Sequence, residues 1–114
     1  MKTIITASGA FLTGTEIADA VTAYALALSR VRALDVVDIP FVARDGSHRR
    51  AQFRIGWQVD TAVTSAGQPA EELLEVDTIL DLHAKSRSAT LERDAGVRGG
   101  FVEVSPDTNW DEVI

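Results

Sequence analysis

The spacing of apolar residues predicts one long helix near the start of the chain. Between residues 14 and 32, apolar side chains recur at three- and four-residue steps, which places them on one face of a helix. These residues are Ile17, Val21, Tyr24, Leu28 and Val31. Thr13 and Glu16 have the spacing of a capping box, which favours a helix start at this point. We therefore expect this helix to bury its apolar face against a core.

A β-hairpin is the second element that the pattern predicts. Apolar and polar residues alternate over residues 35–43 and again over 51–59, as they do in half-buried strands. Asp45 and Gly46 lie between the two segments, and an Asp-Gly pair is a strong hairpin signal. Pro40 cannot donate a backbone hydrogen bond, so it predicts an edge position or a bulge in the first strand.

Residues 69–87 carry conflicting signals. Pro69 and the acidic residues that follow it are typical of a helix start, and Lys85 and Arg87 are typical of a helix end. Alternate positions are also apolar or small, as in a long strand: Leu74, Val76, Thr78, Leu80, Leu82 and Ala84. We predict a helix, because Glu and Asp are rare in strands and because one broad helix face would carry Leu73, Val76, Ile79, Leu80 and Ala84.

The remaining elements complete an α+β fold. We expect an opening strand at Thr3–Thr6, a short strand within residues 59–65 and a last strand at Phe101–Val104. Two helices would then pack on a mostly antiparallel sheet. The predicted order of strands and helices along the chain is close to that of a ferredoxin-like βαββαβ fold. We predict a single domain over residues 1–104, followed by an acidic tail at residues 105–114.

The amino-acid composition favours one packed domain and excludes several kinds of functional site. The chain has 114 residues, of which 46% are hydrophobic, and this suffices for one packed core. It has no cysteine, which excludes disulfides, thiolate nucleophiles and cysteine-based zinc sites. The N-terminal segment is a poor signal peptide, and no apolar run approaches the length of a membrane helix. We therefore expect a cytoplasmic protein without a membrane partner.

Charge identifies one candidate binding site. The chain carries 11 Lys and Arg against 17 Asp and Glu, a formal net charge of −6, which disfavours nucleic acid as a general partner. The predicted hairpin is the exception, because it gathers cations that bind phosphate or carboxylate. These candidate anion-binding residues are Arg44, His48, Arg49, Arg50 and Arg54.

A complementary acidic segment points to self-association. Carboxylates are frequent where the second helix is predicted to begin: Glu71, Glu72, Glu75, Asp77 and Asp81. These residues could pair with the hairpin cations of a second copy of the chain. Because a two-fold interface uses the same surface on both copies, we predict a homodimer.

Catalytic motifs are missing. Neither of the glycine-rich phosphate loops nor the G-x-S-x-G nucleophile motif occurs. His48 and His83 are the only histidines, so we predict no metal site, no cofactor and no catalytic residues. We expect a non-enzymatic interaction or accessory domain. The alternatives are a small ligand-binding enzyme that uses His83 with Asp77 or Asp81, and an anion- or nucleic-acid-binding module that uses the arginine-rich hairpin.

Overall fold

The computed structural model describes residues 1–67 and 71–99, with side chains described as far as residue 93. The elements in these residues are β1 (Lys2–Thr6), β2 (Gly9–Thr13), α1 (Thr15–Arg30), β3 (Leu34–Val42), β4 (His48–Gly56), β5 (Ala62–Ser65) and α2 (Val76–Gly99). The predicted α+β class is confirmed. The ferredoxin-like plan is not, because a hairpin instead of a single strand precedes α1. The strand expected at Phe101–Val104 lies outside the described residues.

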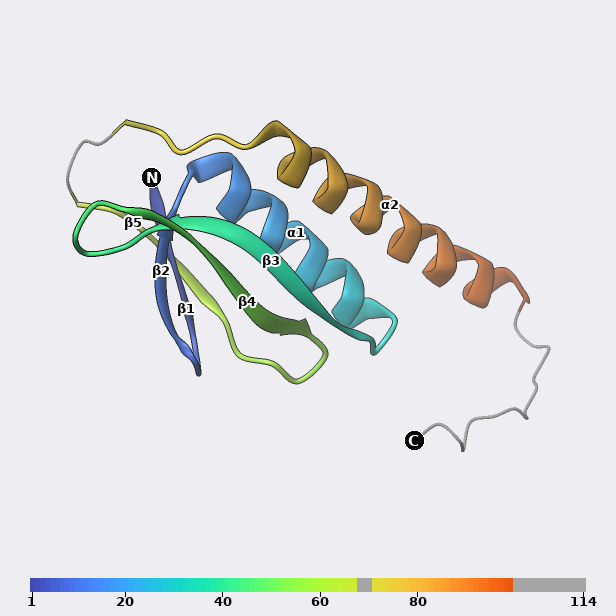
Figure 1. Ribbon diagram of the computed structural model, residues 1–114. Helices are drawn as coiled ribbons and strands as arrows, with labels where there is room; N and C mark the ends of the chain where they lie inside the picture. The colour runs from blue at the N-terminus through green and yellow to red at the C-terminus, as the bar shows by residue number, and fades with distance from the viewer. Residues whose placement is uncertain (68–70, 100–114) are drawn as a thin grey trace.

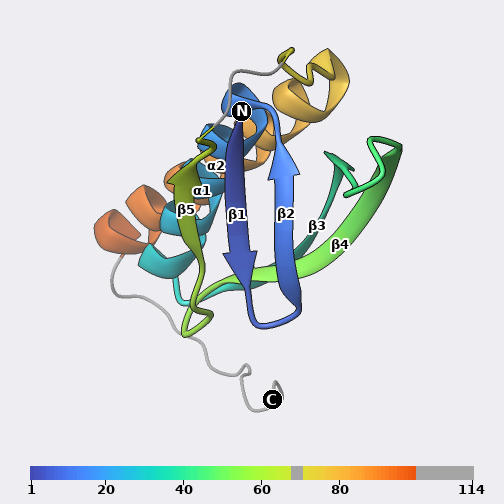
Figure 2. The ribbon, with the colours of Figure 1, turned by 90° about the vertical axis from the view of Figure 1, so that its left-hand side faces the viewer.

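The described strands form one antiparallel sheet of two ribbons. Its strand order is β4-β3-β2-β1-β5, and both helices lie on the same side of it (Figure 2). β3 and β4 pair along nine positions, whereas β2 meets β3 only where Leu12 faces Val42. The two ribbons therefore share a narrow joint. β3 is not the edge strand that Pro40 predicted, because it lies between β4 and β2. Its pairing with β2 is limited to Leu12 and Val42, so β3 tolerates a residue without an N–H.

Aromatic packing seals this joint. Phe11 on β2 stacks on Phe53 of β4 with ring centroids 5.4 Å apart, and it meets Phe41 of β3 edge to face at 5.2 Å. The hydroxyl of Thr13 is fully buried and donates to the carbonyl oxygen of Pro40 at 2.8 Å. These contacts join the ribbons where backbone pairing ends. We infer that side-chain packing holds the sheet together at this point.

α1 supplies the main apolar face of the core. As predicted, its buried residues recur at helical spacing: Ile17, Ala18, Ala20, Val21, Tyr24, Ala27 and Leu28. They pack with Ile4 of β1, with Val37 and Ile39 of β3, and with Phe53 and Ile55 of β4. A helix that contacts both ribbons fixes their relative position, because separating the ribbons would expose this shared apolar surface.

The turns follow the sequence signals closely. In the hairpin between β3 and β4, the Asp45 carboxylate accepts hydrogen bonds from the backbone and the hydroxyl of Ser47, and Gly46 has a φ of +85°. Gly56 ends β4 with a φ of +117°, and a Cβ there would lie 2.4 Å from the carbonyl oxygen of Ala33. The predicted hairpin is confirmed.

The start of α1 differs from the sequence prediction. No side chain of the predicted capping box caps it, because Thr13 bonds to Pro40 instead. The carboxylate of Glu72 takes this role from the segment that precedes α2. It accepts the backbone N–H of Thr15 at 2.8 Å and contacts the Met1 amino group at 2.5 Å. The close approach requires Gly14, since a Cβ there would overlap the carbonyl oxygen of Leu73.

α2 begins later than predicted and packs mainly on α1. It starts at Val76 and not near Pro69, because Glu71–Glu75 forms an extended segment that crosses the start of α1. The two helices run in the same direction (Figure 1). Among the α2 residues whose side chains are described, Ile79, Leu82 and Ala89 are the buried apolar ones. No helix in the described residues is both long enough and apolar enough to cross a membrane.

The Glu72 contact predicts a specific dependence of stability on pH. The Met1 amino group, followed by the Thr15 backbone N–H, lowers the pKa of Glu72 to about 2 from its ordinary value near 4.5. A carboxyl whose folded pKa is depressed stabilises the fold fully above its unfolded pKa, and this contribution is lost as pH falls toward the folded pKa. Glu72 should therefore contribute above pH 4.5 and lose its contribution between about pH 4.5 and 2.

We predict that Glu72→Gln lowers the unfolding midpoint at neutral pH and flattens its decline between pH 4.5 and 2. Thermal unfolding followed by circular dichroism over this range measures both effects. Glu71→Gln is the matched control, because Glu71 is an exposed neighbour for which the structure gives no hydrogen bond or ion pair. Equal acid profiles for the wild type and Glu72→Gln would contradict the prediction.

Candidate functional site

The hairpin cations do not form one site. Arg50 is engaged within the chain, because its guanidinium lies 2.6 Å from a carboxylate oxygen of Asp38 and 3.0 Å from one of Glu75. Arg49 is exposed and reaches Asp45 at 3.8 Å. His48 is exposed as well. Of the acidic residues predicted to meet these cations in a second copy, Glu75 pairs with Arg50 of the same chain.

Electrostatics confirm that Arg50 is used structurally. Hydrogen bonds from Gln52 and then from Arg50 lower the pKa of Asp38. Hydrogen bonds from Thr78 and then from Arg50 lower the pKa of Glu75. Each carboxylate is thus held in its charged form by a donor in addition to Arg50. This network links β3 and β4 to the start of α2, and it pairs Arg50 with two carboxylates of its own chain.

Arg44 and Arg49 line a hollow beside the hairpin. Its volume is about 520 Å³, and Leu12, Phe41 and Val42 supply apolar surface. None of its lining residues is acidic. Arg54 lies elsewhere, in a separate hollow that also contains Asp60. Of the five predicted residues, only Arg44 and Arg49 are therefore brought to one cavity, and both are exposed.

The residues of the alternative enzyme hypothesis do not converge. His83 is exposed on α2, and the carboxylate of Asp81 lies 3.5 Å from Lys85. In the part of the chain that the structure describes, no three His, Asp or Glu side chains gather in a way that could hold a metal ion. Tyr24 is buried and donates a 2.5 Å hydrogen bond to Asp35. Burial and this carboxylate raise the pKa of Tyr24, so its phenol stays protonated.

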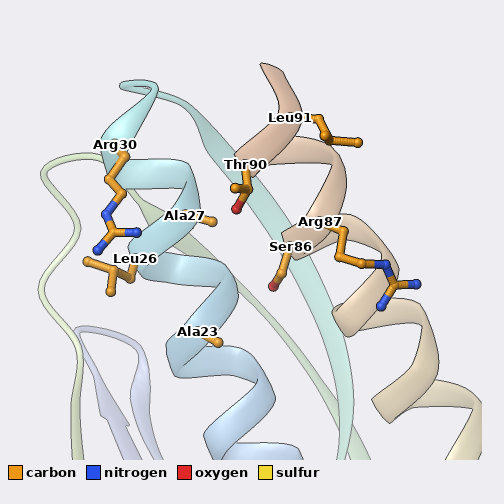
Figure 3. Close-up of a pocket in the computed structure, with 8 residues that line it drawn as sticks. All are labelled: Ala23, Leu26, Ala27, Arg30, Ser86, Arg87, Thr90 and Leu91. Atoms are coloured by element: carbon orange, nitrogen blue, oxygen red, sulfur yellow. The ribbon is translucent and has the colours of Figure 1, made fainter. Parts of the chain in front are cut away.

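A groove between α1 and α2 is the apolar cavity that sequence analysis missed. Figure 3 shows side chains from the C-terminal half of α1 and from the facing part of α2 around it. Its volume is about 440 Å³. The lining residues are Ala23, Leu26, Ala27, Arg30, Ser86, Arg87, Thr90 and Leu91. The lining contains no acidic residue, and Arg30 and Arg87 come from opposite walls.

One polar atom in this groove lacks a partner. The hydroxyl oxygen of Ser86 is buried without a hydrogen bond, and Figure 3 shows the Ser86 side chain directed toward α1. Leaving a buried hydroxyl unpaired costs about 1–3 kcal/mol. A group that entered the groove could remove this cost by forming the missing hydrogen bond.

α2 has apolar residues on two opposite sides. Thr78, Ile79, Leu82 and Ala89 are buried against the rest of the domain. At about 100° per residue, Val76, Leu80, Ala84 and Leu91 share a second arc of about 80° that points away from the buried one. These four residues form what we call the outer stripe. Val76, Leu80 and Leu91 are between 58% and 65% exposed. The sequence signal for this stripe was the apolar spacing that also resembled a strand.

Comparisons with family models, with curated proteins and with solved structures found no match for this chain.

The unpaired hydroxyl generates a prediction about stability. Ser86→Ala should raise the free energy of unfolding by about 1 kcal/mol, because it removes a buried group that forms no hydrogen bond. Chemical denaturation measures this change. Ser29→Ala is the control, because Ser29 is also part-buried on a helix but donates to the carbonyl oxygen of Ala25 at 2.9 Å. Both changes gain the same helix propensity. A Ser86→Ala protein no more stable than Ser29→Ala would contradict the prediction.

Proposed function

We propose that this chain is a non-enzymatic interaction domain that acts as a homodimer. The outer stripe of α2 is the observation that carries this proposal. Single exposed apolar residues are common on protein surfaces, but residues aligned at helical spacing on one side of a helix favour association. The absence of cysteine in the sequence is compatible with the cytoplasmic location that forms part of this proposal.

The helical layer supports a protein partner more than a small molecule. Leu26 on α1 and Leu80 and Leu91 on α2 are each more than half exposed on this layer. The groove between the helices adds apolar surface to the outer stripe, since Leu91 belongs to both. A second protein surface could cover a broad apolar area of this kind. A catalytic pocket would instead require several polar groups directed at one point.

The homodimer can be tested by placing charge in the outer stripe. Leu80→Asp and Leu91→Asp should each weaken self-association by about tenfold or more, because dimerisation would bury an unpaired carboxylate. Sedimentation equilibrium over a wide concentration range measures the dissociation constant. Leu34→Asp is the matched control, since Leu34 is 51% exposed on β3, away from the helical layer. A wild-type protein that is monomeric at every concentration would refute the homodimer.

A second candidate function is anion binding at the hollow beside the hairpin. The presence of Arg44 and Arg49 without an acidic lining residue favours it, since guanidinium groups bind phosphate and carboxylate. The hollow lies beside the β3–β4 turn and is lined by residues of the sheet and its loops, whereas the outer stripe lies on α2. Binding at one surface would therefore not require the other.

Inorganic polyphosphate is a suitable probe for this second candidate. Its affinity should fall about tenfold or more over a tenfold rise in salt concentration, and Arg44→Ala combined with Arg49→Ala should abolish it. Isothermal titration calorimetry measures both effects. Arg32→Ala is the control, because Arg32 is also exposed but packs over the ring of Trp57. Binding that persists in the double variant, or that ignores salt, would exclude the hollow as the site.

A further inference from the structure

The helical layer carries opposite charges at its two ends. Arg30 and Arg87 flank the groove at the C-terminal half of α1, and no ion pair within the described residues engages either of them. The first two turns of α2 instead carry Asp77 and Asp81, next to the exposed apolar residues Val76 and Leu80. We call these four residues the acidic start of α2. One end of the layer is therefore apolar and basic, and the other is apolar and acidic.

We propose that the acidic start of α2 in one copy packs against the α2 wall of the groove, at Arg87 and Leu91, in a second copy. This inference rests on the proposed homodimer and names its interface. A two-fold axis perpendicular to α2 makes the contact reciprocal, because each copy then offers both a groove and an acidic start. The partner at this wall is thus a second copy of this chain.

The geometry of α2 permits this reciprocal contact. The residues that would take part run from Val76 to Leu91, and at 1.5 Å per residue they extend over roughly 22 Å of helix. In an antiparallel pair centred near the middle of this stretch, Val76 of one copy lies at the level of Leu91 of the other. Leu80 then lies at the level of Arg87. Each apolar end of one helix therefore meets the apolar end of its partner.

Charge selects the antiparallel arrangement over the parallel one. In a parallel pair, Asp77 would lie near the second Asp77 and Arg87 near the second Arg87, and like charges in contact oppose association. In the antiparallel pair, Asp77 instead approaches Arg87 of the second copy, whereas Asp81 keeps its ion pair with Lys85 of its own chain. Charges of this kind fix partner orientation more than they add affinity, and we assign most of the affinity to the apolar residues.

Reversing the charge on either side provides a decisive test. Arg87→Glu and Asp77→Lys should each raise the dimer dissociation constant about tenfold, because each places like charges together in both halves of the interface. An equimolar mixture of the two variants should regain near wild-type association. In the mixed dimer, one contact pairs Glu with Lys and the other pairs the native Arg with the native Asp. Sedimentation equilibrium of each variant and of the mixture measures this result.

The controls separate this inference from the homodimer itself. Arg44→Glu mixed with Asp60→Lys changes the same charges away from the helical layer and should leave association unchanged in every combination. If the wild type dimerises but the reversed variants associate normally, or if their mixture shows no recovery, the assigned interface is wrong and the homodimer stands. If the wild type never dimerises, the proposed function fails and this inference fails with it.

Cross-linking gives a second readout that does not depend on charge reversal. The chain has no cysteine, so introduced thiols are the only ones present. A variant with both Val76→Cys and Leu91→Cys should form a covalent dimer on mild oxidation, because these positions face each other between copies. They are about 22 Å apart within one helix, too far for an internal disulfide. Neither single variant should form a covalent dimer, and equal cross-linking of the single and double variants would overturn the antiparallel register.

Discussion

The packing of α1 against both ribbons of the sheet is the interaction on which the rest of the structure depends. Backbone pairing between the ribbons is limited to the meeting of Leu12 and Val42. The apolar face of α1, which is buried along its length, contacts both ribbons and so holds them as one sheet. Phe11 reinforces the joint from β2 by contacting Phe41 and Phe53. Loss of this shared core would separate two ribbons that hydrogen bonding alone joins weakly.

Once α1 is in place, the extended segment before α2 determines where α2 lies. Glu72 binds the start of α1, and Glu75 binds Arg50 of β4. The segment from residue 72 to residue 75 is therefore fixed at both of its ends. α2 then follows α1 in the same direction and packs mainly on it (Figure 1). This arrangement buries one side of α2 and leaves Val76, Leu80 and Leu91 exposed on the other. The proposed interface is a consequence of this placement.

The ion pairs in the structure differ from those that the charged segments of the sequence predicted. Cations of the hairpin and carboxylates of residues 71–81 are complementary, and they were predicted to meet between two copies. The structure instead pairs Arg50 with Asp38 and Glu75 inside one chain. The cations beside the groove between α1 and α2 are Arg30 and Arg87, which sequence analysis did not select because they are far apart along the chain and fall within helical segments. Their proximity depends on how the two helices pack.

Local patterns in the sequence were sufficient to predict the α+β class, the helix at residues 14–32 and the hairpin around Asp45 and Gly46. Each rests on interactions between residues close in the chain, such as the side-chain bonds of Asp45 to Ser47. The tertiary structure alone decided that Glu72 caps α1, that β2 joins the sheet and that Arg50 is engaged. It also decided which side of α2 is buried. The face predicted from the sequence includes Val76 and Leu80, which are exposed, because α1 covers the side of Ile79 and Leu82 instead. Partners brought together from distant parts of the chain leave no periodic signal in a single sequence.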